Sequence, residues 1–284
     1  SAADVRFDGI NMAIDTANGS ASVCAKEIFT RLGAKCHMLS DTPDGENINL
    51  NCGSTHMQEL CDFVKANKLD LGVAFDGDAD RMLAVDSNGE IVDGDKIIAI
   101  CATQMKQENK LAKNTAVVTV MSNMGFFKFC EENSINCART AVGDRYVLER
   151  MLKDGYNIGG EQSGHVIFLD YATTGDGELS AVKLIEAVVK SGASLEQLSR
   201  VMTVYPQVLI NVPVTPEGKR KYNNDEYIIS AVQEAEMELH GDGRVLVRVS
   251  GTEPLVRVML EGKDIQQITR LGNDIADVVK ERLS

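Results

Sequence analysis

Short apolar runs alternate with amphipathic segments along the first part of the chain. The elements predicted there are a strand over 12–15, a helix over 21–32 ended by Gly33, a strand over 34–39, a helix over 57–67 and strands over 69–75 and 82–86. Strands that alternate with amphipathic helices are typical of an α/β domain.

The same order of elements returns roughly one hundred residues later. The predicted copies are a strand over 116–120, a helix over 126–133, a strand over 136–142, a helix over 145–154 and strands over 156–159 and 166–169. The repetition predicts two domains of one topology. In each copy an unusual loop lies between the last two strands, and binding residues favour loops that a rigid scaffold holds.

A different pattern follows three prolines, Pro206, Pro213 and Pro216, which we interpret as a linker. A helix is expected over 224–239, strands over 244–249 and 255–261, and a last helix from Ile265 onward. We therefore predict an α/β fold made of two successive α/β domains of similar topology, over 1–106 and 107–204, and a smaller α+β domain over 205–284.

Composition narrows the classes of partner. The formal net charge of −13 opposes binding to nucleic acid and to anionic lipid. No apolar stretch approaches the roughly 20 residues of a membrane helix, and the first nine residues lack the apolar region of a signal peptide. Seven cysteines without CxxC spacing are expected to be reduced thiols, as in a cytoplasmic protein.

Three carboxylates follow one predicted strand in the run Asp76-Gly-Asp78-Ala-Asp80-Arg81, hereafter the metal loop. Carboxylates on alternate residues can converge on one hard cation, and without a cation they repel one another. A turn with solvated acids is the alternative, and the buried-looking strand directly before the run disfavours it. An EF-hand is disfavoured because its glycine is replaced by Arg81 and its twelfth residue is Ser87. We predict Mg²⁺ on Asp76, Asp78 and Asp80, with Arg81 beside a phosphate.

The second candidate is the run from Gly159 to His165, hereafter the sugar loop. Its glycines permit close backbone approach. Glu161, Ser163 and His165 offer an acceptor, a hydroxyl and an imidazole, a set that suits the vicinal hydroxyls of a sugar. A plain glycine-rich turn is the alternative.

The third candidate is the run from Arg248 to Pro254 with Arg257 beyond it, hereafter the phosphate loop. Two arginines flank hydroxyls and free backbone N–H groups. A phosphate monoester is bound by such guanidinium contacts and amide donors. A hairpin with two surface arginines is the alternative.

Together, these loops resemble those of the α-D-phosphohexomutase superfamily in order and spacing. Further stretches, at 43–49, 52–56, 142–147 and 173–177, are similar to its glucosamine-phosphate branch. The resemblance implies interconversion of glucosamine 6-phosphate and glucosamine 1-phosphate, through a phosphoserine and a bisphosphate intermediate, with Mg²⁺ as cofactor. It also suggests a homodimer.

The resemblance assigns roles to individual residues. His165 is the candidate for proton transfer, with an orienting hydrogen-bond donor as the equal alternative. Arg81 would assist the transferred phosphoryl group. The implied substrate contacts are Asp144, Arg145, Glu161, Ser163, Arg248, Ser250, Gly251, Thr252 and Arg257.

The family's first domain carries its catalytic phosphoserine in a Ser-His-Asn-Pro segment, which this sequence does not contain. The chain thus resembles domains two to four, and we expect it to be inactive without the missing N-terminal domain as partner. Three alternatives remain: a glucose or mannose phosphate mutase of the same superfamily, a non-catalytic phosphosugar-binding module, and a phosphatase with Asp76 as nucleophile.

Overall fold

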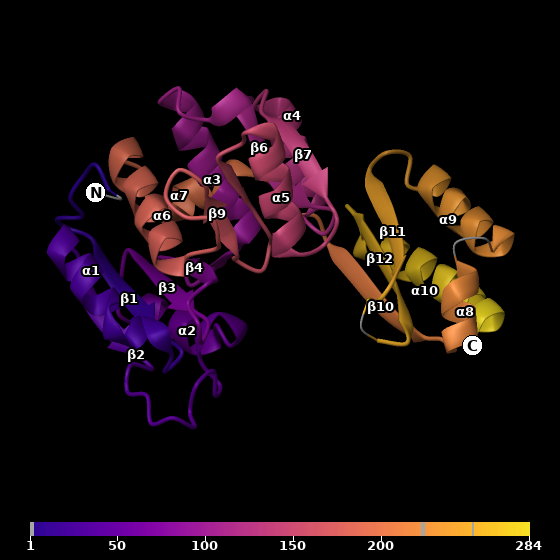
Figure 1. The fold of residues 1–284 in the computed structure, drawn as a ribbon, viewed down its shortest axis with the longest axis horizontal. Helices are drawn as coiled ribbons and strands as arrows, with labels where there is room; N and C mark the ends of the chain where they lie inside the picture. The colour runs from indigo at the N-terminus through magenta and orange to yellow at the C-terminus, as the bar shows by residue number, and fades with distance from the viewer. Residues whose placement is uncertain (1–2, 223–224, 252) are drawn as a thin grey trace. The chain divides into compact units, whose positions relative to one another are not determined.

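A computed structural model describes residues 3–222, 225–251 and 253–284 of the chain (Figure 1). The chain forms two compact units. The first contains Ser1–Ser122 and Phe126–Thr203, and the second contains Asn123–Gly125 and Val204–Ser284. Each unit has a hydrophobic core of its own.

The first unit contains two sheets with the same pairing pattern. The first has the order β2-β1-β3-β4-β5 and the second the order β7-β6-β8-β9. In both, the first two pairings are parallel and the hairpin that follows is antiparallel. The strands are β1 (Asn11–Asp15), β2 (Lys35–Leu39), β3 (Leu71–Phe75), β4 (Met82–Asp86), β5 (Ile91–Val92), β6 (Thr115–Thr119), β7 (Asn136–Thr140), β8 (Ile158–Gly160) and β9 (Val166–Phe168). The predicted repetition of one α/β topology is confirmed.

Helices cover both faces of these sheets. They are α1 (Ala25–Leu32), α2 (Gln58–Ala66), α3 (Gly94–Gln107), α4 (Met124–Glu132), α5 (Asp144–Asp154), α6 (Gly177–Ser191) and α7 (Leu195–Leu198). Side chains alternate along β1 as the period of two requires. Met12 and Ile14 enter the largest core, whereas Ala13 packs with Leu60 and Val64 of α2.

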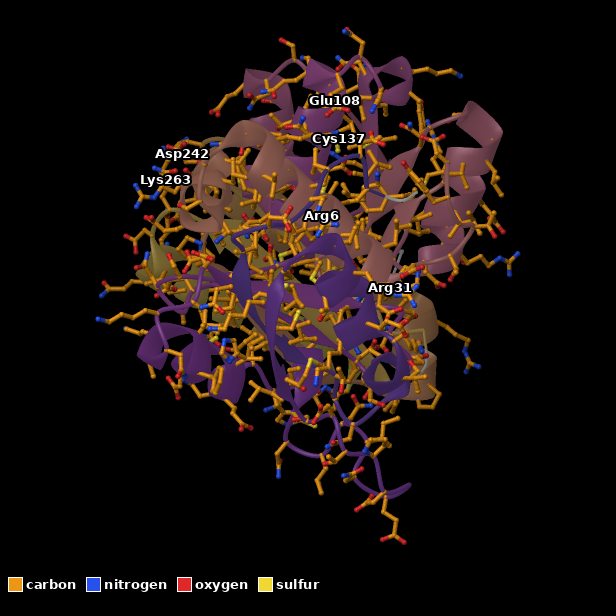
Figure 2. All side chains as sticks on the ribbon, turned by 90° about the vertical axis from the view of Figure 1, so that its left-hand side faces the viewer. Arg6, Arg31, Glu108, Cys137, Asp242 and Lys263 are labelled. Carbon is orange, nitrogen blue, oxygen red and sulfur yellow. The ribbon has the colours of Figure 1, made fainter. Side chains whose placement is uncertain are left out.

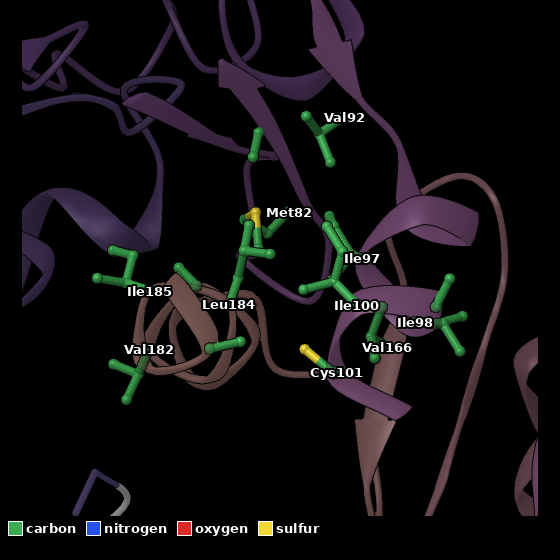
Figure 3. Packing of buried hydrophobic residues seen from close by; sticks show 14 of the residues in the cluster. Met82, Val92, Ile97, Ile98, Ile100, Cys101, Val166, Val182, Leu184 and Ile185 are labelled. Carbon is green, nitrogen blue, oxygen red and sulfur yellow. The ribbon is translucent and has the colours of Figure 1, made fainter. Parts of the chain in front are cut away.

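Helices α3 and α6 connect the two sheets into one unit. They contact each other, α3 contacts β8, and α6 contacts both β4 and β9. Figure 3 shows side chains of both helices, among them Ile97 of α3 and Leu184 of α6, in the buried cluster that also contains Met82 of β4 and Val166 of β9. These residues belong to one buried cluster that spans both sheets, so the two hairpin loops are held on a common core.

The second unit is an antiparallel sheet with helices against it. Its strands are β10 (Gln207–Pro213), β11 (Gly243–Val249) and β12 (Leu255–Gly262), in the order β10-β12-β11. Its helices are α8 (Pro216–Lys221), α9 (Glu226–Glu238) and α10 (Ile265–Leu283). Helix α10 contacts β10 and β12, and α9 contacts β11. The predicted small α+β domain is confirmed.

A buried carboxylate ties the start of α4 to this second unit. The Glu261 side chain on β12 accepts hydrogen bonds from the Met124 amide at 2.9 Å and from Arg244 Nε at 2.6 Å. Asn123 Oδ1 accepts from the amides of Tyr205 and Gly125, both at 2.9 Å. Ionised groups this deep are tolerated only when they are paired.

Several sequence expectations need correction. The helix expected over 21–32 is interrupted at Cys24, whose φ of −126° separates a 3₁₀ turn (Ser20–Val23) from α1. The linker prediction is wrong for the prolines: Pro206 precedes β10, Pro213 is its last residue, and Pro216 begins α8. An edge strand tolerates a missing N–H, and so does the first turn of a helix.

Helices α3 and α6 were not predicted at all. Asn224, the expected first residue of the helix now called α9, lies outside the described residues, and that helix starts after the Asp225 cap. The boundaries expected at 106/107 and 204/205 stay a prediction.

Many exposed side chains of the acidic chain form ion pairs. Figure 2 labels charged side chains such as Asp242 and Lys263, whose oxygen and nitrogen lie 2.8 Å apart. Exposed pairs of this kind contribute little stability. Among the described residues, every helix is too short or too polar to cross a lipid bilayer.

Candidate functional site

The metal loop connects β3 to β4, where a fully buried strand ends. Asp76, Asp78 and Asp80 each place one carboxylate oxygen within 4.8 Å of the others. Asp78 is exposed, and the other two are half-buried. Three hard oxygen donors at this spacing fit a cation such as Mg²⁺ and leave room for water or phosphate oxygens. They do not fit zinc, which prefers nitrogen and sulfur.

Electrostatics in the loop favour a cation. Burial raises the pKa of Asp76 to about 6, and the nearby charges of Asp80 and Asp78 add to this rise. The Arg81 amide, which donates to Asp76 Oδ1 at 3.1 Å, opposes it. A divalent cation would remove the repulsion among the carboxylates.

The Arg81 side chain lies beside the carboxylates of Asp76 and Asp80 without a close contact to either. Its Nε is 4.0 Å from Asp76 Oδ2 and 3.9 Å from Asp80 Oδ1. The side chain is about half exposed, at 46%. This exposure is compatible with the phosphate contact expected for Arg81, which stays a prediction.

The loop backbone is held in an uncommon conformation. Ala79 has a φ of +58°, in the left-handed region that non-glycine residues rarely adopt. The Ala79 amide donates to the Asp76 carbonyl at 3.1 Å, and the Ala79 carbonyl accepts from the Gly177 amide at 2.8 Å. Such strain persists only where surrounding contacts enforce it, as they do at many functional sites.

The sugar loop occupies the equivalent hairpin between β8 and β9, and it touches the metal loop directly. His165 Nδ1 lies 3.0 Å from Asp80 Oδ2, and the Met82 amide donates to the Gly164 carbonyl at 3.1 Å. Gly164 has a φ of +95°, and a Cβ there would lie 2.4 Å from the Met82 carbonyl oxygen. The close approach of the two loops therefore requires glycine at this position.

Two further contacts fix the sugar loop. Gln162 Nε2 donates to Asp93 Oδ2 at 3.1 Å, and Asp93 also caps α3. Glu161 Oε1 accepts from the Gly143 amide at 3.1 Å, which brings the start of α5 to the loop. Ser163 is exposed. Of the predicted substrate groups, Glu161 is thus engaged through one oxygen, while the Ser163 hydroxyl faces solvent.

Asp144 and Arg145 are the first two residues of α5 and are exposed. Because Gly143 is bound to Glu161, both residues lie next to the sugar loop along the chain. The Arg145 Nε is 2.7 Å from Glu149 Oε1, one helical turn on, and its side chain is 80% exposed. Such an exposed pair is easily exchanged for a ligand anion.

The phosphate loop connects β11 to β12 in the second unit, and its two arginines are cross-strand partners. Arg248 is paired with Arg257 in the sheet register. Burial lowers the pKa of Arg248, and the charge of Arg257 lowers it further. Arg257 Nη2 donates to Glu253 Oε2 at 2.7 Å, whereas its buried Nε has no partner among the described residues. Two adjacent guanidinium groups with an unused donor suit an anion.

The remaining residues of the phosphate loop differ in their solvent exposure. Ser250 is buried, and its hydroxyl accepts from the Glu253 amide at 3.2 Å, which shapes the loop. Gly251 is exposed. Thr252 lies outside the described residues.

The structure thus brings the predicted metal and sugar loops together and places the phosphate loop in the other compact unit. Three residues without a predicted role hold the first two loops: Asp93, Gly175 and Gly177. The stretch 173–177 was singled out only by its similarity. Its Gly175 amide donates to His165 Nε2 at 3.0 Å.

Comparisons with known proteins identify the family of the three successive domains. Sequence models of the phosphoglucomutase/phosphomannomutase family match in three parts: α/β/α domain II over residues 2–89, α/β/α domain III over 93–205, and the C-terminal domain over 209–278. The phosphoglucosamine mutases of Brevibacillus brevis and Caldicellulosiruptor saccharolyticus are 55% and 52% identical over 98% of this chain. The chain spans about 62% of the length of these relatives.

Solved structures share the fold. Aspergillus fumigatus N-acetylphosphoglucosamine mutase, in complex with GlcNAc-6P and magnesium, matches 99% of this chain and 63% of its own, with a TM-score of 0.81 and 18% identity. A product complex of N-acetylglucosamine-phosphate mutase, of the α-D-phosphohexomutase superfamily, matches 98% of this chain and 63% of its own, with a TM-score of 0.76 and 22% identity. At these identities the likeness shows the fold.

Proposed function

Because the chain belongs to the phosphoglucomutase/phosphomannomutase family, of which it contains domains II, III and IV, we propose that it forms the cation-, sugar- and phosphate-binding part of a phosphoglucosamine mutase. The reaction is the interconversion of glucosamine 6-phosphate and glucosamine 1-phosphate through a phosphoserine. That serine comes from a first domain, which is the partner this part needs.

The observation that supports the proposal most is the joined pair of loops. Three carboxylates lie within 4.8 Å of one another, and one of them is hydrogen-bonded to His165 of the sugar loop. Phosphoryl transfer depends chiefly on positioning and on stabilising the charge of the transferred group. A cation-binding loop joined to a sugar-binding loop places both functions on one rigid core.

In this proposal, Asp76, Asp78 and Asp80 hold Mg²⁺, which supplies Lewis-acid stabilisation of the transferred phosphoryl group when bound. Arg81 adds an exposed positive charge beside Asp76 and Asp80. Because its nitrogens stay clear of both carboxylates at about 4 Å, it can contact a phosphate oxygen without breaking a close ion pair.

The sugar and phosphate loops orient the substrate. Glu161 and Ser163 bind sugar hydroxyls, with Asp144 and Arg145 adjacent to them. Arg248, Ser250, Gly251, Thr252 and Arg257 form the site for the phosphate that is not reacting. Binding energy from this distal phosphate serves to align the reacting end.

A fusion experiment tests the proposal. We expect no turnover of glucosamine 6-phosphate by this chain alone, and turnover by a fusion to the phosphoserine-bearing first domain of the Brevibacillus brevis relative. A fusion with its catalytic serine replaced by alanine is the control. Turnover by the isolated chain would contradict the role of the serine. A fusion that converts glucose phosphates but not glucosamine phosphates would contradict the substrate.

The cellular setting and the assembly are part of the proposal. All seven cysteines lie within the described residues and are free thiols, which suits the reducing cytoplasm. A homodimer is the assembly that the family resemblance implies, and sedimentation of the fusion protein tests it.

A further inference from the structure

Two cysteines of the first unit, away from the three loops in the sequence, lie next to each other. Cys130 is on the last turn of α4, and Cys137, which Figure 2 labels, is on β7, with six residues between them. Cys130 belongs to the largest buried cluster and is 1% exposed, and the partly buried Cys137 packs against that cluster. Both are free thiols, and they are hydrogen-bonded to each other.

The periods of the helix and the strand bring these thiols together. The Ile135 amide donates to the Cys130 carbonyl at 2.8 Å, so the chain turns back on the end of α4 before β7 begins. Cys137 and Arg139 are two residues apart in β7 and therefore lie on one face of the sheet. Phe127 and Cys130 are three residues apart in α4 and share one face of the helix. The guanidinium carbon of Arg139 lies 3.8 Å from the centre of the Phe127 ring, which shows that these two faces meet.

The surroundings of the pair make Cys137 the more reactive thiol. The hydrogen bond with Cys130 lowers the pKa of Cys137. Burial and the charge of Asp95 oppose this effect, whereas the charge and a hydrogen bond of Arg139 support it. The same bond between the thiols, together with burial, raises the pKa of Cys130, which keeps its proton. The thiolate is the nucleophilic form of cysteine, so Cys137 is the one poised to attack.

The other partly exposed cysteines lack this environment. Cys24, Cys36 and Cys137 are all partly exposed. The Cys24 thiol donates to Glu178 Oε1 at 2.9 Å, and this bond is the main cause that raises the pKa of Cys24 to about 11. Burial raises the pKa of Cys36. Solvent access alone therefore does not single out Cys137, whereas its neighbours do.

From this arrangement we infer that Cys130 and Cys137 form a peroxide-reactive dithiol, in which Cys137 is the attacking thiolate and Cys130 the resolving thiol. The pair lies outside the three loops, so the inference goes beyond the proposed function and does not depend on it.

The reaction with hydrogen peroxide has two steps. The Cys137 sulfur attacks one peroxide oxygen, an S–O bond forms while the O–O bond breaks, and the other oxygen leaves as hydroxide. The Cys130 sulfur then displaces the hydroxyl group from the Cys137 sulfur, and that group leaves with the Cys130 proton as water. The two sulfurs lose two electrons, which the peroxide gains. Because the thiols are already in contact, the second step is intramolecular and therefore favoured.

Limiting iodoacetamide on the folded chain, followed by digestion and mass spectrometry, tests the reactivity of Cys137. We expect Cys137 to be alkylated at least about tenfold faster than Cys36. Arg139→Gln should slow the alkylation of Cys137 by about threefold or more, without affecting Cys36. Arg139→Lys, which keeps the positive charge, is the matched control and should retain most of the rate. Alkylation of Cys137 no faster than that of Cys36 would overturn the inference.

Treatment of the folded chain with hydrogen peroxide tests the pairing. We expect the wild type to lose two hydrogen atoms in mass, with Cys130 and Cys137 in one cross-linked peptide, and dithiothreitol to restore the original mass. Cys130→Ala lacks the resolving thiol, so its Cys137 should instead gain oxygen atoms. Cys36→Ala is the control and should form the same cross-link as the wild type.

The cross-link in the wild type decides the question even where Cys130→Ala does not fold. A wild-type chain in which Cys137 gains oxygen without a bond to Cys130 would overturn the inference. A chain in which other cysteines are linked first would overturn it as well.

Discussion

At the scale of single residues, the closely spaced carboxylates of the metal loop lower the stability of the folded chain when no cation is bound. Asp76 is half-buried, and its pKa is raised to about 6 by burial and then by the charges of Asp80 and Asp78. A carboxyl group whose folded pKa lies above its unfolded value costs stability as pH rises through that window. In the proposed metal site, a divalent ion bound by the three carboxylates would offset this cost.

Asp78→Asn separates these two effects. Asp78 is exposed, and removing its charge relieves repulsion from two carboxylates within 4.8 Å. Without Mg²⁺ we expect the variant to be more stable than wild type by about 0.5 kcal/mol. The rise in melting temperature that Mg²⁺ gives the wild type should be lost. Thermal denaturation with and without Mg²⁺ measures both. A variant destabilised without Mg²⁺, or one that keeps the full Mg²⁺ effect, would contradict the assignment.

The sequence predicted this loop well and its environment poorly, for a physical reason. Alternate carboxylates within five residues must be near one another in any turn, so Asp76, Asp78 and Asp80 were found from spacing alone. The bond from His165 to Asp80 joins residues far apart in sequence. It depends on how two sheets pack on one core, which no local pattern encodes.

At the scale of elements, α3 and α6, the two longest helices that the sequence did not reveal, are buried between the sheets. Helix α3 buries six successive residues from Ile97 to Ala102, and α6 buries residues on nearly every side. A helix covered all round lacks the polar stripe that marks amphipathic helices. Most strands were found because their apolar runs are short and bounded by turn residues, whereas β5 and β10 were not predicted.

The ends of α3 and α6 are tied by an ion-pair cluster with a defined pH dependence. Glu108 Oε2 is 2.7 Å from Lys110 Nζ, and Oε1 is 2.8 Å from Lys190 Nζ. Hydrogen bonds from Lys110, Lys190 and Gln104 lower the pKa of Glu108 to about 2. A lowered carboxyl pKa gives stability that is present above the unfolded value of 4.5 and is lost as pH falls toward 2.

Glu108→Gln should therefore lower the free energy of unfolding by about 1–2 kcal/mol at pH 7, after allowance for solvent screening of the lysines. The difference from wild type should shrink as pH falls from about 5 to 3. Urea denaturation across this range measures it. Glu217→Gln, at an exposed pair with Lys221, is the control and should have little effect. A difference that does not change with pH would rule out the ion pairs as its cause.

The start of α4 offers a second prediction at this scale. Asn123 is buried, donates to the Tyr205 carbonyl at 2.9 Å, and accepts from the amides of Tyr205 and Gly125. Asn123→Ala leaves these backbone groups without that partner, so we expect a loss of about 2–3 kcal/mol in unfolding free energy. Asn88→Ala, at an exposed turn, should change it by less than about 0.5 kcal/mol. A loss for Asn123→Ala as small as that expected for Asn88→Ala would show that the buried amide is dispensable.

At the scale of the whole molecule, one α/β topology occurs twice and is followed by a domain of a different topology. Both α/β sheets place a hairpin loop at the same point of their topology, between β3 and β4 and between β8 and β9. The sequence predicted this equivalence, because the repeated order of apolar runs is a local feature. It also predicted a separate α+β domain for the phosphate loop, but it did not predict that the two α/β sheets share one core.

The separation of the chain into two compact units predicts which unfolding transition each ligand stabilises. Because each unit has a separate core, we expect calorimetry to resolve two unfolding transitions. Mg²⁺ should raise only the transition of the unit that contains Asp78, and inorganic phosphate only that of the unit that contains Arg257. A ligand at one hundred times its Kd adds about 2.7 kcal/mol to the state that binds it.

Two variants assign these transitions. Asp78→Asn should abolish the Mg²⁺ shift and leave the phosphate shift, whereas Arg257→Gln should do the reverse. The Arg257 Nε has no partner among the described residues, so its replacement removes an anion donor with little loss of internal bonding beyond Glu253. A single transition that both ligands raise would show that the units unfold as one. The phosphate loop would then be coupled to the metal loop even without the first domain.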